Sequence, residues 1–198
     1  QDPAKRRMNI EKQKEHFKDH IATLRKYDNI TILDFENPDS INYRIRFLFE
    51  EDHCVLHISG DLGSLTASNY NNMCYEQFED FVHSPGYFES KVVCHSRDFY
   101  EYDFNKAKEE LEKRFEDYEI ESPYEWESDE EYREEKIEEI LDDFYERTGL
   151  GSKAYEILSE IDPDCFEYIT HIGEEKTEII ELYLLAFELA QEQLKVRK

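Results

Sequence analysis

Basic residues are scarce in this chain. Lysine and arginine number 24 against 49 aspartates and glutamates in 198 residues, a formal net charge of −25. This balance disfavours direct binding to DNA, RNA or anionic lipid, because each of these is itself a polyanion, and it favours a basic partner. Residues 1–7 resemble a vector-derived remnant before a start at Met8. Without their three positive charges and one negative charge the net is −27.

Cysteine and long apolar runs are also rare. Four cysteines lack the density of a disulfide scaffold, so we expect reduced thiols in a cytoplasm. The longest apolar run, Leu182 to Phe187, is far too short to cross a bilayer, and we expect no membrane span.

Motifs of common enzymes are absent too. The chain has no Walker loop, dinucleotide fingerprint, Gly-x-Ser-x-Gly, His-Glu-x-x-His or EF-hand loop. Asp164 with Glu174 and Lys176 matches only loosely the two carboxylates and lysine of metal-dependent nucleases, and a polyanionic nuclease would repel its substrate. We therefore predict a protein that is not an enzyme and that uses no cofactor and no metal.

One pair of histidines has the spacing of metal ligands. His16 and His20 lie one helical turn apart, as in some zinc sites. Two ligands do not complete a site, and Cys54 and His57 would point to opposite faces of a strand. We interpret both histidines as surface residues.

Core material is nevertheless plentiful, since 39% of the residues are hydrophobic and 14% aromatic. Apolar spacing predicts an amphipathic helix over residues 9–26, and the alternation over residues 41–49 predicts a strand with one buried face. Further strands are expected over residues 29–35, 54–59 and 64–68. Short turns between them predict an antiparallel meander.

The remainder of the chain predicts helices, except that residues 83–103 stay unassigned. The helices are expected over residues 104–118, 128–147, 153–161 and 174–198. The last is apolar around more than half its circumference, which predicts the buried centre of a helical lobe. The fold class is therefore α+β: an N-terminal helix and a small antiparallel β-meander, then a helical C-terminal lobe.

Two lobes are expected, and they can form one continuous domain. Residues 8–120 would form the α+β lobe and residues 121–198 the acidic helical lobe. The sequence leaves monomer and homodimer open, because the apolar stretch from Ile179 to Leu189 can pack within one chain or between two.

The acidic residues cluster in one stretch. Between Glu109 and Glu146 there are nineteen acidic and four basic residues. Over residues 129–146, seven like-charged pairs four residues apart outnumber two opposite pairs, Asp129/Arg133 and Asp143/Arg147, at a cost of about 1 to 2 kcal/mol to an isolated helix. Stability alone would not select this pattern. The competing interpretation is a solvated face that maintains solubility.

The charge density of this stretch resembles that of a nucleic acid. Ten carboxylates over residues 129–146 give about one charge per 2.7 Å of helix axis, compared with about 1.7 Å for duplex DNA and 3.4 Å for one of its strands. Aromatic residues among the acids supply the anchors that interfaces favour. The predicted partner-binding residues are Glu121, Tyr124, Glu125, Trp126, Glu127, Asp129, Glu130, Glu131, Tyr132, Glu134, Glu135, Glu138, Glu139, Asp142 and Asp143.

Residues 43–112 carry a second pattern. It comprises "YRIRF", "HISGDLG", Tyr70, "YFESKVVC" and "YEYDFNKAKEEL". Over about a third of the chain it resembles small acidic proteins of phages and mobile elements in Gram-positive bacteria, and acidic members of the broader anti-CRISPR class block Cas nucleases at their DNA-binding surfaces.

The resemblance implies an inhibitor that acts in the cytoplasm of a bacterial host. Its acidic, DNA-mimicking surface would occupy the nucleic-acid-binding groove of a Cas9-type effector with guide RNA. The alternatives are a metal-dependent nuclease and a non-enzymatic virion or adaptor protein that binds another basic partner.

Overall fold

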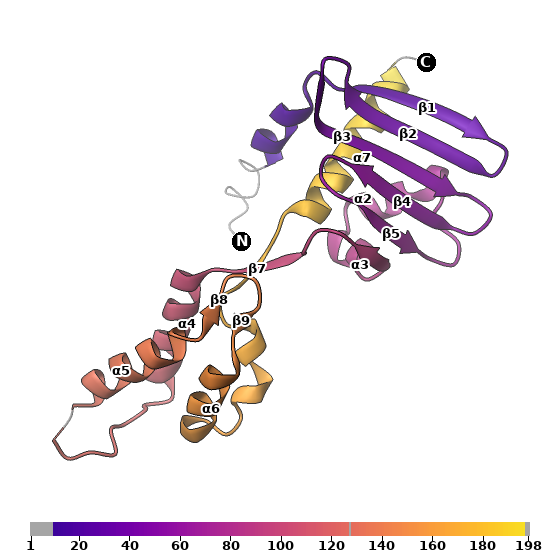
Figure 1. Ribbon diagram of the computed structural model, residues 1–198. Coiled ribbons are helices and arrows are strands. Elements are labelled where there is room, and N and C mark those ends of the chain that lie inside the picture. Colours follow the sequence, from indigo (N-terminus) through magenta and orange to yellow (C-terminus); the bar gives the residue numbers. More distant parts are fainter. Residues whose placement is uncertain (1–9, 127, 197–198) are drawn as a thin grey trace. The chain divides into compact units, whose positions relative to one another are not determined.

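The chain folds into two compact units. The computed structural model describes residues 10–126 and 128–196 (Figure 1). Unit 1 is formed by residues 1–98 together with residues 178–198, and unit 2 by residues 99–177. The predicted α+β class is confirmed: a helical segment and an antiparallel meander are followed by a mostly helical region.

The limits of these units differ from the predicted lobes, residues 8–120 and 121–198. The chain returns to unit 1 after Thr177, because its last helix packs on the sheet of that unit. The limit predicted near residue 120 falls within unit 2, between two helices that pack against each other. The remnant predicted at residues 1–7 lies outside the described residues.

Unit 1 contains a six-stranded antiparallel sheet whose strands follow chain order. The strands are β1 (Ile21–Tyr27), β2 (Ile30–Asn37), β3 (Ser40–Glu50), β4 (Val55–Gly60), β5 (Leu65–Ser68) and β6 (Val92–His95). The meander predicted from β2 to β5 is confirmed. Both β6 and the following short strand β7 (Tyr100–Tyr102) lie in residues 83–103, which the sequence pattern left unassigned.

The helix predicted over residues 9–26 is wrong beyond residue 17. Residues 10–14 are helical and η1 (Glu15–Phe17) is one 3₁₀ turn, but the next element is β1. β1 pairs with β2 over seven residue positions. Asp28, at φ 48°, supplies the left-handed conformation that a tight hairpin turn requires. Cross-strand pairing therefore overrides the helical spacing of the apolar residues.

Helices cover one face of this sheet (Figure 1). They are α2 (Glu79–Val82), α3 (Pro85–Glu89) and α7 (Ile179–Val196), and the turn η2 (Tyr75–Gln77) leads into α2. α7 contacts β1, β2, α2 and α3. The long C-terminal helix is thus buried as predicted, but the prediction that it forms the centre of a helical lobe is wrong. It starts at Ile179, not at residue 174, and its partner is the sheet.

Aromatic rings fill the space between α7 and the sheet. Phe187 of α7 has its ring centroid 5.5 Å from that of Phe47 and 4.6 Å from that of Phe78. Ile45, Phe47 and Phe49 alternate along β3 and are fully buried, which confirms the predicted strand and this part of its buried face. The face is wrong at Ile41, whose side chain is exposed.

The described residues of unit 2 form three helices, two short strand pairs and two 3₁₀ turns. They are α4 (Phe104–Asp117), α5 (Asp129–Leu141), β8 (Phe144–Tyr145), β9 (Gly149–Leu150), α6 (Ser152–Ile161), η3 (Cys165–Glu167), η4 (Ile169–His171) and β10 (Glu174–Lys176), which pairs with β7. The core is mainly aliphatic but includes Phe115: Ala107 and Leu111 of α4 meet Ile137 and Ile140 of α5 and Leu158 of α6.

Candidate partner-binding surface of unit 2

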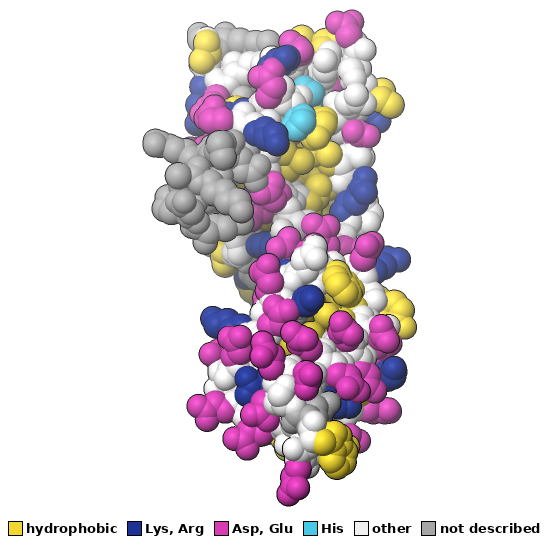
Figure 2. All heavy atoms as spheres, turned by 90° about the vertical axis from the view of Figure 1, so that its left-hand side faces the viewer, with side chains coloured by type: hydrophobic (Ala, Val, Ile, Leu, Met, Phe, Trp, Pro, Cys, Tyr) yellow, Lys and Arg dark blue, Asp and Glu magenta, His cyan; other side chains and the backbone are white. Residues whose placement is uncertain are grey.

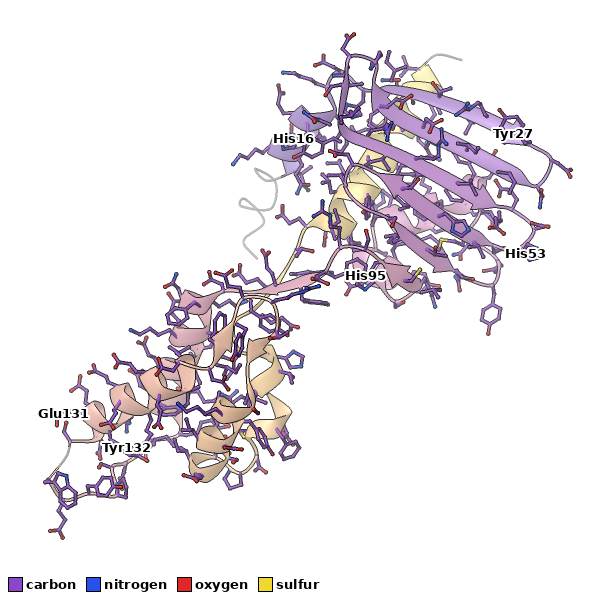
Figure 3. All side chains as sticks on the ribbon, in the orientation of Figure 1. His16, Tyr27, His53, His95, Glu131 and Tyr132 are labelled. Atoms are coloured by element: carbon purple, nitrogen blue, oxygen red, sulfur yellow. The ribbon has the colours of Figure 1, made fainter. Side chains whose placement is uncertain are left out.

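α5 begins at Asp129, next to the predicted helix start at residue 128, and Ser128 is its N-cap. The Ser128 hydroxyl oxygen accepts the N–H of Glu131 at 3.2 Å, and a carboxylate oxygen of Glu131 accepts the N–H of Ser128 at 3.3 Å, which forms a capping box. Figure 3 shows Glu131 and Tyr132 at this end of α5. The acids of the first turn also interact favourably with the helix dipole. Part of the acidic sequence therefore stabilises its own helix.

Three other predicted surface acids have partners within unit 2. Asp129 accepts a backbone N–H from the preceding loop at 2.8 Å. Glu139 accepts a hydrogen bond from Lys136 at 2.8 Å, which lowers the pKa of Glu139. Asp143 accepts the N–H of Ala154 at 3.1 Å, and this bond lowers the pKa of Asp143. These carboxylates are held by the fold itself.

The expected pair Asp129/Arg133 does not form. Arg133 donates its Nε hydrogen to the carbonyl oxygen of Ile120 instead, which ties α5 to the chain segment after α4. α5 also ends at Leu141, six residues before the predicted end at residue 147, because the chain turns into the β8–β9 hairpin. The acidic helix is therefore six residues shorter than predicted.

The remaining acids of α5 and of its C-cap form the acidic patch, defined as Glu130, Glu134, Glu135, Glu138 and Asp142. All five side chains are exposed. Within residues 10–126 and 128–196, none of these carboxylates takes part in a hydrogen bond or an ion pair. Four of them are four residues apart in sequence, so successive carboxylates step by about 6 Å along the helix axis. The fold therefore leaves these five carboxylates without a side-chain hydrogen bond or ion pair among the described residues.

The loop before α5 presents two exposed aromatic rings. Tyr124 and Trp126 stack with centroids 4.9 Å apart and an interplanar angle of 26°. Their exposed fractions are 48% and 83%. Glu121 and Glu125 are exposed in the same loop, whereas Glu127 lies outside the described residues. A stacked, exposed pair of this kind is a suitable anchor for a partner.

Tyr132 is less available. Its side chain is half-buried, and the Lys136 ammonium lies 5.9 Å from its ring centroid. Of the three aromatic residues predicted to bind a partner, the structure leaves two exposed, Tyr124 and Trp126.

The acidic patch lies in the more acidic unit. Unit 2 carries 28 acidic and nine basic residues, a net of −19, and Figure 2 shows acidic side chains dominating its visible surface. α4 packs against α5 and adds the exposed acids Glu109, Glu112 and Glu116 to the unit. The predicted site omitted these residues, although their position within the acidic stretch was a usable signal.

The nuclease-like residues are not assembled into a metal site. Asp164 precedes η3, whereas Glu174 and Lys176 lie on β10, and a Glu174 oxygen is 2.9 Å from His171 Nδ1. Among the residues that the structure describes, no three His, Cys, Asp or Glu side chains lie close enough to hold a metal ion.

The prediction that His16 and His20 are both surface residues is wrong for His20. His20 is only 4% exposed, and its Nε2 lies 3.1 Å from the carbonyl oxygen of Tyr43. Burial lowers the pKa of His20. His16 is exposed and stacks on the Tyr43 ring, with centroids 4.2 Å apart. The irregular chain after residue 14 replaces the expected helical turn.

Unit 1 contains a hydroxyl–imidazole–carboxylate chain that sequence reasoning missed. His57 Nδ1 lies 3.1 Å from the Thr66 hydroxyl, and His57 Nε2 lies 2.7 Å from a Glu50 carboxylate oxygen. These groups are in the order of a nucleophilic triad. Thr66 is the direct cross-strand partner of His57, however, and Glu50 lies on the strand to the other side. Ordinary sheet pairing therefore accounts for the contacts.

No family model, curated protein or solved structure matches this chain. None of the described helices is long and apolar enough to cross a membrane. A proposal on function therefore rests on the chemistry of the surface.

Proposed function

We propose that the chain is a phage- or mobile-element-encoded inhibitor that binds a Cas9-type effector with guide RNA in the cytoplasm of a bacterial host. It acts without catalysis, by placing the acidic patch and the Tyr124/Trp126 pair in the groove that receives nucleic acid. The observation that carries this proposal is the set of exposed carboxylates on α5 and its C-cap that have no side-chain partner among the residues the structure describes.

The charge of the groove matches this surface. Cas9-type effectors hold the heteroduplex in a positively charged channel and read the adjacent DNA motif with arginines. A polyanion that enters such a channel releases bound counterions, as DNA itself does. The carboxylates on α5 are already aligned by the helix, and the Ser128 capping box fixes the start of that helix. Little ordering is therefore required when the partner binds.

The aromatic pair adds an uncharged anchor to the same surface. Tyr124 and Trp126 contact each other before any partner binds, so their side chains lose less conformational entropy on association. Exposed tyrosine and tryptophan side chains are enriched among residues that dominate binding energy. Charge would bring the partner close, and the stacked rings would hold it.

The deciding experiment is competition for target DNA on a purified effector–guide complex. Wild-type protein should displace labelled DNA, and displacement should weaken as salt rises, because exposed charges are screened. Simultaneous occupancy, with neither ligand weakening the other, contradicts binding in the groove. That outcome would point instead to an adaptor that contacts a basic surface elsewhere.

The location of the charge is tested by a matched pair of variants. The patch variant replaces Glu134, Glu135, Glu138 and Asp142 by lysine, and we expect competition to weaken by about 10- to 100-fold. The control replaces four exposed acids of unit 1 by lysine: Asp19, Glu36, Asp39 and Asp80. Both variants change the net charge from −25 to −17. Equal losses in the two would show that total charge, not the patch, matters.

The aromatic anchor has its own control. Changing Trp126 to Ala should weaken binding by tenfold or more, the effect expected of a residue central to an interface. Changing Tyr155 to Ala removes another exposed aromatic ring of unit 2, on α6, and should leave competition unchanged.

A further inference from the structure

Two loops of unit 1 bring a pair of cysteines together. Cys54 lies in the turn between β3 and β4, and Cys74 lies between β5 and η2. Their sulfur atoms are 3.3 Å apart, although the residues are 20 positions apart in sequence. Both side chains are half-buried. A small oxidant therefore has access to the pair.

The approach of the two sulfurs is maintained by other contacts. The carbonyl oxygen of Glu51 lies 3.9 Å from the Cys54 sulfur and 3.5 Å from the Cys74 sulfur, so it can accept from either thiol. A carboxylate oxygen of Glu51 accepts the N–H of Tyr75 at 3.2 Å. The N–H of Asn69 donates to the carbonyl oxygen of Cys54 at 3.2 Å. The two loops are thus held in register without a covalent bond.

Only a short movement separates this dithiol from a disulfide. A sulfur–sulfur bond is about 2.0 Å long, so the two atoms must approach by about 1.3 Å. Both residues lie outside regular secondary structure, where the backbone can absorb such a shift. The other two cysteines differ: Cys94 is exposed on β6, and Cys165 is buried in unit 2.

We propose that Cys54 and Cys74 are an oxidative modification site, at which small-molecule disulfides convert the dithiol into an intramolecular disulfide. The thiolate of Cys54 attacks one sulfur of R–S–S–R, whose sulfur–sulfur bond breaks and releases one R–S⁻. The Cys74 sulfur then attacks Cys54 Sγ in the mixed disulfide and releases the second R–S⁻. The two thiol protons end on the released thiols, so the protein loses two electrons and R–S–S–R gains them.

The order of attack follows from the surroundings of Cys74. Burial, the Cys54 thiol and Glu51 together raise the pKa of Cys74 to about 12. Cys74 is therefore almost entirely protonated near neutral pH and is a poor first nucleophile. Cys54 attacks first and Cys74 resolves the intermediate. Oxidation should become faster as pH rises.

The new bond would strengthen unit 1. It closes a loop that contains β4 and β5, which restricts the unfolded chain. It also anchors the segment that leads directly into Tyr75, whose ring packs against Phe49 and Phe187. The acidic patch belongs to unit 2, so this inference stands independently of the proposed function.

The test uses the full chain treated with oxidised glutathione under native conditions, then unfolded and alkylated with N-ethylmaleimide so that the buried Cys165 is also reached. Alkylation should fall from four cysteines to two, or to one where the exposed Cys94 has formed a mixed disulfide, which the intact mass shows as one added glutathione. Trypsin leaves both cysteines in one peptide, because no lysine or arginine lies between Arg46 and Lys91. A protease specific for acidic residues cuts after Asp61 and separates them. The expected non-reduced product links residues 53–61 to residues 62–76.

Variants and a melting curve complete the test. Changing Cys94 to Ser should preserve the link, whereas changing Cys74 to Ser should abolish it. Oxidation should raise the melting temperature of the wild type by about 5 to 10 °C. Four alkylatable thiols after treatment, a link to Cys94 or Cys165, or a link only between chains would overturn the proposal. Peptide mapping of the wild type decides this even if the Cys74 variant fails to fold.

Discussion

Unit 1 carries a net charge of −6 over 119 residues, whereas unit 2 carries −19 over 79. The two units also treat their acids differently. In unit 1, Asp34 is 5% exposed and accepts hydrogen bonds from Arg25 and Arg46 on the neighbouring strands. In unit 2, Glu134 and its neighbours in the acidic patch are exposed and have no partner among the described residues. Asp34 thus stabilises the sheet of unit 1, whereas the acidic patch of unit 2 leaves its carboxylates unpaired among the described residues.

The hydrophobic cores of the two units also differ. Aromatic rings around Phe187 pack between sheet and helix in unit 1, whereas smaller aliphatic side chains join the helices of unit 2. A large aromatic core can stabilise a unit without help from its surface. Unit 2 depends more on helix caps, because like charges on α5 oppose its helix.

The largest expected effect comes from the aromatic core. Changing Phe187 to Ala should lower the free energy of unfolding by about 3 to 5 kcal/mol, because it removes buried contacts and leaves a cavity. Changing the exposed Phe166 of unit 2 to Ala should alter it by less than about 0.5 kcal/mol. Urea denaturation measures both. A similar loss of unfolding free energy in the two variants would contradict a central position of Phe187 in the core.

The second largest effect should come from the paired acid Asp34, compared with the unpaired acid Glu134. Changing Asp34 to Ala should destabilise the protein by about 1 to 2 kcal/mol, a value reduced by the solvent exposure of both arginines. Changing Glu134 to Ala should be neutral or slightly stabilising, since it removes like-charge repulsion from α5. Denaturant titration of both variants gives the comparison, and a larger loss for Glu134 would reverse it.

The capping box should contribute less to the free energy of unfolding than Phe187 or Asp34. Changing Ser128 to Ala removes the acceptor for the Glu131 N–H and should cost about 1 kcal/mol. Hydrogen exchange is expected to accelerate in the first turn of α5 and to stay unchanged in the sheet. Unchanged exchange in α5 would mean that the helix does not depend on its cap.

The smallest effect concerns pH. Burial lowers the pKa of His20 in the folded state, so the unfolded chain binds a proton more readily. The folded state therefore loses stability as pH falls below the ordinary histidine pKa of about 6.5. Changing His20 to Gln should flatten melting temperature against pH between about 7 and 5. Changing the exposed His53 to Gln is the control and should leave that slope unchanged.

Local signals predicted much of the fold and part of the site. The alternation along β3 and the helix start near Ser128 involve residues close in sequence; the start holds, and the alternation holds from Ile45 to Phe49. Charge clustering located the acidic helix, but the sequence did not separate its structural acids from its free ones. Asp143 is held by the N–H of Ala154, eleven residues later, and charge counting cannot detect such a bond.

The sequence by itself determined the acidity of one stretch, the alternation that buries one face of a sheet and the start of α5, because each depends on neighbouring side chains. Only the tertiary structure decided that residues 21–27 form a strand and that the last helix covers the sheet. Ala22 donates its N–H to Gln193, 171 positions away. The spacing of apolar residues shows which side chains can be buried together on one face. Contacts between segments distant in sequence decide which helix or strand covers that face.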